Sequence, residues 1–196
     1  MQNTRDNLLE HAEILFADKG FYGTSINDVA KQVGVTKQGL LHYFPAKQKL
    51  YGAVLEGATE YLMQSLTQGV KADQGPLEKL IAIITTMASD EDRLTRVSRL
   101  LVRELLDNPV RAETAHKWYL APFLESVESI VIEGQRQGIF KPVHPMAFIY
   151  NLLGSQQYFV VSQPTLKQLH GPEKYREHLD NHALELRRII ESTLLV

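Results

Sequence analysis

The sequence predicts an all-α protein, because three observations agree. Apolar residues recur at helical spacing along the chain, and no segment has the alternation of β-branched residues that is typical of a strand. Glycine and proline stand between the periodic segments, where they end or begin helices. The chain has 196 residues, of which 44% are hydrophobic and 22% charged, so it is long enough and apolar enough to bury a core. We therefore expect about nine helices.

The N-terminal segment predicts the first helix. Asn3 or Thr4 can cap it, and Gly20 is expected to end it, because glycine readily adopts the backbone conformation that follows a helix. Phe21 and Tyr22 are then expected to complete a small three-helix core. The apolar stripe of the first helix consists of Leu8, Ala12, Leu15 and Phe16.

Residues 25–44 predict two short helices joined by a turn. Ser25 can cap the first of them, with Asp28 three residues later as the second member of a capping box. Gly34 stops this helix, since a glycine can take the left-handed conformation needed there. Thr36 caps the next helix. This arrangement is the pattern of a helix-turn-helix.

The second of these helices has the properties of a DNA-recognition helix. Its apolar residues Leu40 and Phe44 are expected to point to the core, which leaves its polar residues outward. A recognition helix presents such residues to the major groove, where lysine reads guanine and glutamine reads adenine. The same helical geometry also occurs in proteins that never bind DNA, so the flanking sequence has to decide. The candidates for contact with base edges are Thr36, Lys37, Gln38 and His42.

The flanking sequence carries a dense set of further features. They are Ala12, Leu15, Phe16, Gly20, Phe21, Thr24, Ser25, Asp28, Val29, Ala30, Gly34, Val35, Thr36, His42, Tyr43, Phe44, Lys47 and Leu50. With these features, residues 5–55 resemble the N-terminal domain of the TetR family of bacterial transcriptional regulators. The resemblance implies that the first turn of the first helix and the start of the second face the DNA backbone, and that the end of the recognition helix contacts phosphates. The residues concerned are Arg5, Thr24, Ser25, Tyr43 and Lys47.

The rest of the chain predicts further helices separated by breaks. A fourth helix opens at Pro45 and runs to about residue 67, and residues 69–76 form a turn-rich loop. A fifth helix is expected around residues 77–87, and a sixth from the acidic cap at residues 89–92 to about residue 106. The next helix is expected from residue 108 to 137, with an interruption near Leu120. The last two are expected over 144–162 and 172–195, with a loop at 163–171 between them.

We expect two domains, a helix-turn-helix DNA-binding domain over residues 1–47 and a helical effector-binding and dimerisation domain over residues 48–196. The resemblance implies that the fourth helix links them and transmits the signal. It also implies that the last two helices pair with their copies in a second subunit, because a homodimer reads a palindrome that one recognition helix is too short to specify. The apolar residues of these two helices are Phe148, Leu152, Leu153, Tyr158, Phe159, Leu179, Leu184, Leu186, Ile189, Ile190 and Leu194.

The central helices are expected to enclose a pocket for a small-molecule effector. Apolar walls with a few charged groups are typical of such pockets, although aromatic residues at helical spacing are more often simply core. The candidate lining residues are Met87, Arg99, Arg103, Glu104, His116, Trp118, Tyr119, Phe123, Tyr150 and Tyr158.

Several other classes of function find little support in the sequence. The absence of cysteine excludes disulfides and thiol catalysis, and no sequence motif of a hydrolase, a zinc protease or a phosphate-binding loop is present, so we expect neither an enzyme nor a cofactor. His178 and His182 have a spacing that can bind zinc, but two histidines without a third ligand do not predict a metal site. No apolar run is long enough for a membrane span and no signal peptide is evident, so a cytoplasmic location is expected.

The sequence thus predicts a ligand-responsive regulator of transcription that binds double-stranded DNA as a homodimer, and in particular a repressor. Two alternatives remain. One is a DNA-binding regulator that has no effector, or one that activates transcription. The other is an all-helical ligand-binding or interaction module whose helix-turn-helix is only scaffold. The net charge of −2 does not decide among them.

Overall fold

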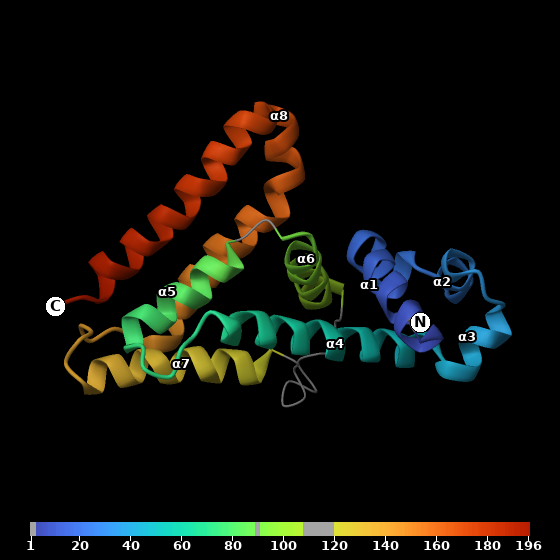
Figure 1. The fold of residues 1–196 in the computed structure, drawn as a ribbon, viewed down its shortest axis with the longest axis horizontal. Coiled ribbons are helices and arrows are strands. Elements are labelled where there is room, and N and C mark those ends of the chain that lie inside the picture. Colours follow the sequence, from blue (N-terminus) through green and yellow to red (C-terminus); the bar gives the residue numbers. More distant parts are fainter. Residues whose placement is uncertain (1–2, 89–90, 108–119) are drawn as a thin grey trace. The chain divides into compact units, whose positions relative to one another are not determined.

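The structure is a computed structural model that describes residues 3–88, 91–107 and 120–196, and the regular elements of this part of the chain are helices (Figure 1). The all-α prediction is confirmed, and the number of described helices is close to the nine expected. The predicted helix start at residue 108 lies outside the described residues. The helices are α1 (Thr4–Gly23), α2 (Ile26–Val33), α3 (Lys37–Tyr43), α4 (Lys47–Gln68), α5 (Pro76–Met87), α6 (Asp92–Asp107), α7 (Ala121–Arg136) and α8 (Pro145–Leu194).

The chain forms two compact units. The first, which we call the N-terminal unit, consists of residues 1–61 and 96–119, and the second, the C-terminal unit, consists of residues 62–95 and 120–196. Helices α4 and α6 therefore contribute residues to both. The functional division at residue 47 stays a prediction.

The N-terminal unit is built on α1, which packs against α2. The predicted stripe of α1 is confirmed, since Leu8, Ala12, Leu15 and Phe16 are all buried. Gly20 interrupts the helix with a φ of 73°, as predicted, and one more turn follows before Thr24. The expectation that Tyr22 belongs to the core is wrong, because its side chain is 74% exposed. Tyr22 instead lies edge-on to the ring of Phe21 at the surface.

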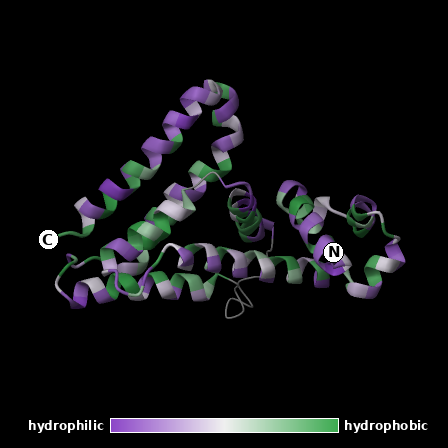
Figure 2. Cartoon of the chain, viewed as in Figure 1, coloured by the Kyte–Doolittle hydropathy of each residue, from purple (hydrophilic) through white to green (hydrophobic). Residues whose placement is uncertain are grey.

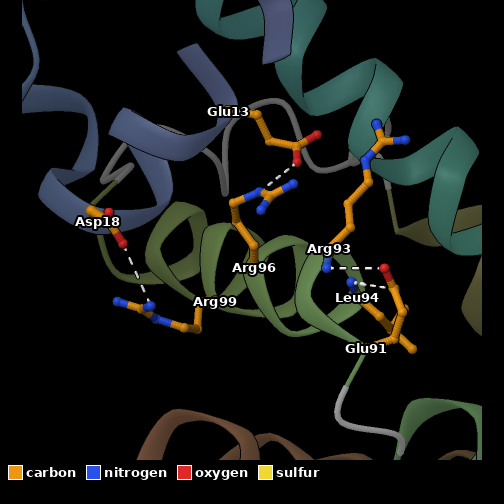
Figure 3. Close-up of polar contacts among 7 residues, drawn as sticks. All are labelled: Glu13, Asp18, Glu91, Arg93, Leu94, Arg96 and Arg99. Carbon is orange, nitrogen blue, oxygen red and sulfur yellow. Dashed lines mark hydrogen bonds and ion pairs between the residues drawn. The ribbon is translucent and has the colours of Figure 1, made fainter. Parts of the chain in front are cut away.

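Ion pairs join α6 to α1 within this unit, as Figure 3 shows. The Nε atom of Arg96 donates to Oε1 of Glu13 at 2.9 Å, and Glu13 is only 4% exposed. Arg99 lies 3.5 Å from a carboxylate oxygen of Asp18, and Arg103 donates to the backbone carbonyl of Asp18 at 2.9 Å. The sequence contained no local signal for these pairs, because the two helices are far apart along the chain.

Glu91 stabilises the start of α6 by accepting hydrogen bonds from two backbone N–H groups. Its carboxylate accepts from Arg93 at 3.1 Å and from Leu94 at 2.7 Å (Figure 3). The first N–H groups of a helix have no partner inside the helix, so an acceptor at this point satisfies them. The predicted acidic cap is confirmed for Glu91.

In the C-terminal unit, α5, α7 and α8 pack against one another. Hydrophobic and hydrophilic residues are interspersed along these helices, as expected for helices that bury one face (Figure 2). Pro122 lies in the first turn of α7, where proline has no helical hydrogen bond to break. The buried residues include Leu80, Ile84, Phe123, Val127, Leu152 and Ile190.

The predicted loop over residues 163–171 is wrong, because this segment is helical and belongs to α8. The only non-helical residue inside α8 is Gly171, with φ 76° and ψ 169°. Glycine adopts a positive φ at little cost, and Pro172 can occupy the first turn of the helix that resumes. A single residue therefore makes the break for which a nine-residue loop was expected. No helix among the described residues is both long enough and apolar enough to span a membrane.

Candidate nucleic-acid interface

The start of α2 is stabilised by a reciprocal capping box, as predicted. The Ser25 side chain accepts from the backbone N–H of Asp28 at 3.1 Å, and the Asp28 carboxylate accepts from the backbone N–H of Ser25 at 3.0 Å. Gly34 ends α2 in the left-handed conformation with a φ of 76°. Both ends of α2 are thus set by residues within it or next to it, so the turn leading to α3 has a defined geometry.

This capping box makes the stability of the folded protein depend on pH. The hydrogen bond from the Ser25 side chain, followed by that from its backbone, holds the pKa of Asp28 below the ordinary value. The folded state therefore binds this proton less tightly than the unfolded state. The stabilisation is present above the unfolded pKa of about 4 and is lost as the pH falls through the lower folded value.

We expect Ser25→Ala to raise the pKa of Asp28 toward its ordinary value and to weaken this pH dependence. Loss of the cap should also lower the free energy of unfolding at neutral pH by about 1 kcal/mol. An NMR titration of the Asp28 carboxyl group in both proteins measures the first effect, and urea denaturation measures the second. An unchanged Asp28 titration in the variant would contradict the assignment.

The N-terminus of α3 is capped by Thr36, whose hydroxyl accepts from the backbone N–H of Gly39 at 3.0 Å. Leu40 and Phe44 are buried, as predicted, and anchor the helix to the N-terminal unit. The helix therefore presents one polar face to solvent. The residues predicted to contact bases or phosphates from this helix are all exposed, namely Thr36, Lys37, Gln38, His42 and Tyr43.

Two cations predicted to contact phosphates lie against aromatic rings. The Nζ atom of Lys47 is 4.2 Å from the centroid of the Phe21 ring, and the guanidinium carbon of Arg5 is 5.5 Å from the centroid of Phe44. The negative face of an aromatic ring attracts a cation at these distances. Arg5 belongs to the first turn of α1, and Lys47 is the first residue of α4. Lys47 is thus tied to the last turn of α1 through Phe21, and Arg5 to the residue that ends α3 through Phe44.

Thr24 differs from the other predicted DNA contacts, because its side chain is only 2% exposed. Its hydroxyl lies 3.1 Å from the carbonyl oxygen of Leu15 and 3.0 Å from that of Gly20. A hydroxyl so placed fixes the junction between α1 and α2 and is not presented to a DNA backbone. Ser25, the next residue, is exposed at the N-terminus of α2, where backbone N–H groups and the helix dipole favour an anion.

Comparison with known proteins decides the family. A family model described as bacterial regulatory proteins, tetR family, matches residues 8–54, and a model described as a tetracyclin repressor-like C-terminal domain matches residues 70–194. The chain belongs to the TetR family. The resemblance noted in the N-terminal sequence is thereby confirmed and extended to most of the chain.

Regulators of transcription from other bacteria are similar to this chain over most of its length. The HTH-type transcriptional regulator RutR of Escherichia coli K12 is 26% identical over 184 residues, which cover 93% of this chain and 86% of RutR. The HTH-type transcriptional repressor KstR2 of Mycolicibacterium smegmatis is 28% identical over 156 residues, covering 76% of this chain and 73% of KstR2. These relatives support regulation of transcription through DNA binding.

Solved structures share the fold. A putative transcriptional regulator from Saccharomonospora viridis, in complex with choline, has a TM-score of 0.78 at 17% identity and covers 98% of this chain and 97% of its own. The structure of the regulator KstR2 of Mycobacterium tuberculosis has a TM-score of 0.71 at 17% identity and covers 100% of this chain and 97% of its own. At this identity the likeness extends to the fold alone.

The residues predicted to line an effector pocket in this TetR-family protein are distributed over both units. Arg99 and Arg103 contact Asp18 of α1, and the buried Glu104 accepts a hydrogen bond from the Tyr51 hydroxyl at 2.7 Å. In the C-terminal unit Met87 and Phe123 are buried, whereas Tyr150 and Tyr158 are exposed. His116, Trp118 and Tyr119 lie outside the described residues.

Two of the surface pockets among the described residues lie on α8, and their linings do not include these predicted residues. The first is about 390 Å³ and is lined by Phe159, Leu166, His170, His178, Asn181, His182 and Glu185. The second is about 540 Å³ and lies between α5 and α8, lined by Thr85, Ala88, Arg176, Leu179, Asp180, Ala183, Leu184 and Arg187.

His182, one of the two histidines considered for zinc, has protein partners on both sides. Its ring stacks on Phe159 at 4.0 Å between centroids, and its Nε2 atom lies 2.9 Å from Oε1 of Gln156. Gln156 donates its amide to the Met87 carbonyl, so its oxygen faces the imidazole and Nε2 of His182 carries the proton. Burial lowers the pKa of His182, which favours the neutral ring. The described residues contain no cluster of three or more His, Cys, Asp or Glu side chains placed to hold a metal.

Proposed function

We propose that this TetR-family protein is a ligand-responsive repressor that binds a palindromic operator as a homodimer and leaves it when a small molecule binds. The observation that carries the proposal is the exposed polar face of α3, whose helix start is capped by Thr36 and whose apolar side is buried. Five neighbouring polar side chains on a short, anchored helix match what a major groove requires.

In this proposal the contacts to DNA fall into two classes. Thr36, Lys37, Gln38 and His42 approach base edges, which carry the sequence information. The remaining contacts meet phosphates and determine register and affinity. They are Arg5, Ser25, Tyr43 and Lys47, together with the backbone N–H groups at the start of α2.

The homodimer is supported by the apolar side chains that α8 leaves exposed. Tyr158 is 76% exposed, Leu184 is 55% exposed and Ile189 is 47% exposed in the single subunit. All three belong to the faces predicted for dimerisation. Large exposed apolar groups on one element are typical of an interface. Other residues of the same faces are buried within the subunit and hold the α8 segments in place, namely Phe148, Leu152, Leu179, Leu186, Ile190 and Leu194.

The effector acts, in this proposal, by binding the form that cannot bind DNA more tightly than the form that can. Helix α4 belongs to both units, so a change in its tilt would alter the separation of the two α3 helices in a dimer. Trp118 is the single tryptophan of the chain and one of the predicted pocket residues, so quenching of its fluorescence offers a direct screen for effectors. Crystal structures with and without an effector that show equal α3 separations would contradict this route.

The decisive experiment is selection of bound duplexes from a random DNA pool by the purified protein at low salt. We expect enrichment of a palindrome whose half-sites are about one helical turn, roughly 34–36 Å, apart. Absence of any enriched sequence, together with no affinity for DNA at low salt, would support the scaffold alternative. Binding to a palindrome from which no small molecule releases the protein would support a regulator without an effector.

The two contact classes predict different results for two substitutions. Lys47→Ala should weaken binding to all duplexes alike. It should also make the negative slope of log affinity against log salt shallower by about 1 for each subunit, because binding then releases one counterion fewer. Gln38→Ala should leave this slope unchanged and relax the preference at one position of the half-site by about 1–3 kcal/mol. Titrations of the selected duplex and of single-base variants over several salt concentrations measure both quantities.

Lys49→Ala provides a matched control, because Lys49 is an exposed lysine in the same first turn of α4 and is not a predicted contact. We expect it to change the salt slope by much less than Lys47→Ala does. Equal effects of the Lys47 and Gln38 substitutions on every sequence would show that the two contact classes are assigned wrongly.

A further inference from the structure

Lys47 is held against the Phe21 ring, with its Nζ atom 4.2 Å from the ring centroid. Phe21 lies in the short turn that follows the break in α1, and Lys47 is the first residue of α4. The two residues come from different helices, so their contact is a tertiary one. An ammonium group over a ring face is attracted by the ring quadrupole and still has N–H groups free to donate elsewhere.

The Phe21 ring is itself fixed by a cluster of aromatic side chains. Its centroid lies 4.9 Å from that of Tyr51 and 6.3 Å from that of Phe16, which is fully buried. Tyr51 is 9% exposed and donates its hydroxyl hydrogen to the buried carboxylate of Glu104 at 2.7 Å. The exposed ring of Tyr22 packs edge-on against Phe21 at 5.4 Å between centroids. Phe21 therefore has little freedom to move away from Lys47.

Gly20 explains why Phe21 reaches this position. Its positive φ of 73° turns the chain out of the α1 helix, and the Thr24 hydroxyl bonds to the Gly20 carbonyl oxygen at 3.0 Å to hold the turn. A Cβ atom at Gly20 would lie 2.8 Å from Oδ2 of Asp107, so both the backbone conformation and the available space favour glycine. The turn thus places Phe21 beside the start of α4.

We propose that Phe21 is a positioning residue for DNA binding, whose ring holds the Lys47 ammonium group in the conformation that contacts a phosphate. The inference rests on the proposed function, in which Lys47 is such a contact. A lysine loses several rotatable bonds of freedom when it is immobilised on a ligand, and a side chain already held in place loses less. Arg5 over the buried ring of Phe44 repeats the arrangement for a second predicted phosphate contact.

The test measures affinity for the selected duplex, or for any duplex at low salt, in variants of the full chain. Phe21→Leu keeps an apolar side chain but removes the ring, and should weaken binding about two- to fivefold per subunit. Phe21→Tyr keeps the ring and should bind as the unmodified protein does. Because Lys47 keeps its charge in both variants, the salt dependence of binding should not change, in contrast to Lys47→Met, which should flatten it.

A double-mutant cycle separates positioning from a merely structural role. If Phe21 acts through Lys47, Phe21→Leu has no further effect on affinity in the Lys47→Met protein. An equal loss in both backgrounds would mean that Phe21 acts through the fold, and would overturn the inference while leaving the proposed function intact. Lys47→Met with unchanged affinity and unchanged salt dependence would instead show that the phosphate contact of Lys47 is assigned wrongly, and the inference about Phe21 would fail with it.

A second replacement keeps the inference testable if Phe21→Leu does not fold. Incorporation of 3,4,5-trifluorophenylalanine at position 21 preserves the size of the ring and removes most of the negative charge from its face. We expect it to weaken DNA binding in the same direction as Phe21→Leu, with an unchanged thermal unfolding midpoint. Binding as tight as that of the unmodified protein would overturn the inference.

Discussion

Arg96→Met is expected to lower the free energy of unfolding by about 3 kcal/mol, because it removes the guanidinium group that donates to the buried carboxylate of Glu13. Glu13 is 4% exposed and accepts from Nε of Arg96 at 2.9 Å (Figure 3). Methionine occupies a similar volume to the stem of arginine, so the loss reports mainly on the charge. Other interactions of Glu13 remain in the variant, which places the expectation at the lower end of the range for broken buried pairs. Urea denaturation measures the difference.

Arg99→Met is the matched control for this prediction, since Arg99 lies on the same helix three residues later. Its partner Asp18 has a side chain that is 53% exposed, and the two charged groups are 3.5 Å apart. Solvent screens such a pair, so we expect a loss below about 1 kcal/mol. Similar losses for Arg96→Met and Arg99→Met would mean that burial of Glu13 does not determine the cost. Glu13→Gln combined with Arg96→Met should recover part of the stability, because the buried side chain that has lost Arg96 is then neutral.

Gly134→Ala should also lower the free energy of unfolding by about 3 kcal/mol, here through overpacking. An added Cβ atom would lie 2.1 Å from Cδ2 of Phe140 and 2.7 Å from its Cγ, well inside contact distance. Phe140 is 3% exposed, its backbone N–H donates to the Gly134 carbonyl at 3.1 Å, and it pairs with Leu195 in an isolated β-bridge. The ring therefore cannot move aside without disturbing the end of α7. Thermal and urea denaturation of the variant test the expectation.

Gly57→Ala is a matched control on α4, because nothing lies within 4 Å of the Cβ atom that it would add. Alanine favours the helix over glycine by roughly 0.5–1 kcal/mol, so this variant should be at least as stable as the unmodified protein. Phe140→Leu in the Gly134→Ala background should restore part of the loss, since a smaller side chain makes room for the methyl group. A Gly134→Ala protein of normal stability would contradict the packing described for Phe140.

The sequence predicted the helix-turn-helix with its ends because the interactions that set those ends are local. Ser25 and Asp28 are three residues apart, Thr36 caps an N–H three residues on, and Gly34 acts through its own backbone. The exposure of the polar face of α3 follows from the same helical period that buries Leu40 and Phe44. Prediction was weaker where the same residues can mark either a loop or a short break within a helix, as glycine followed by proline does. The sequence predicts a loop over residues 163–171, whereas Gly171 alone, with its positive φ, makes the break.

The sequence by itself thus determined the helical class, the helix-turn-helix and the exposed polar residues that α3 carries. Only the tertiary structure decided which side chains support them. Arg96 pairs with Glu13 across 83 positions of the chain, and Tyr51 with Glu104 across 53. The ring of Phe21 meets Lys47 through a tertiary contact as well. Helical periodicity shows which face of a helix is buried but not which distant helix covers it, so these partners depend on how the helices pack.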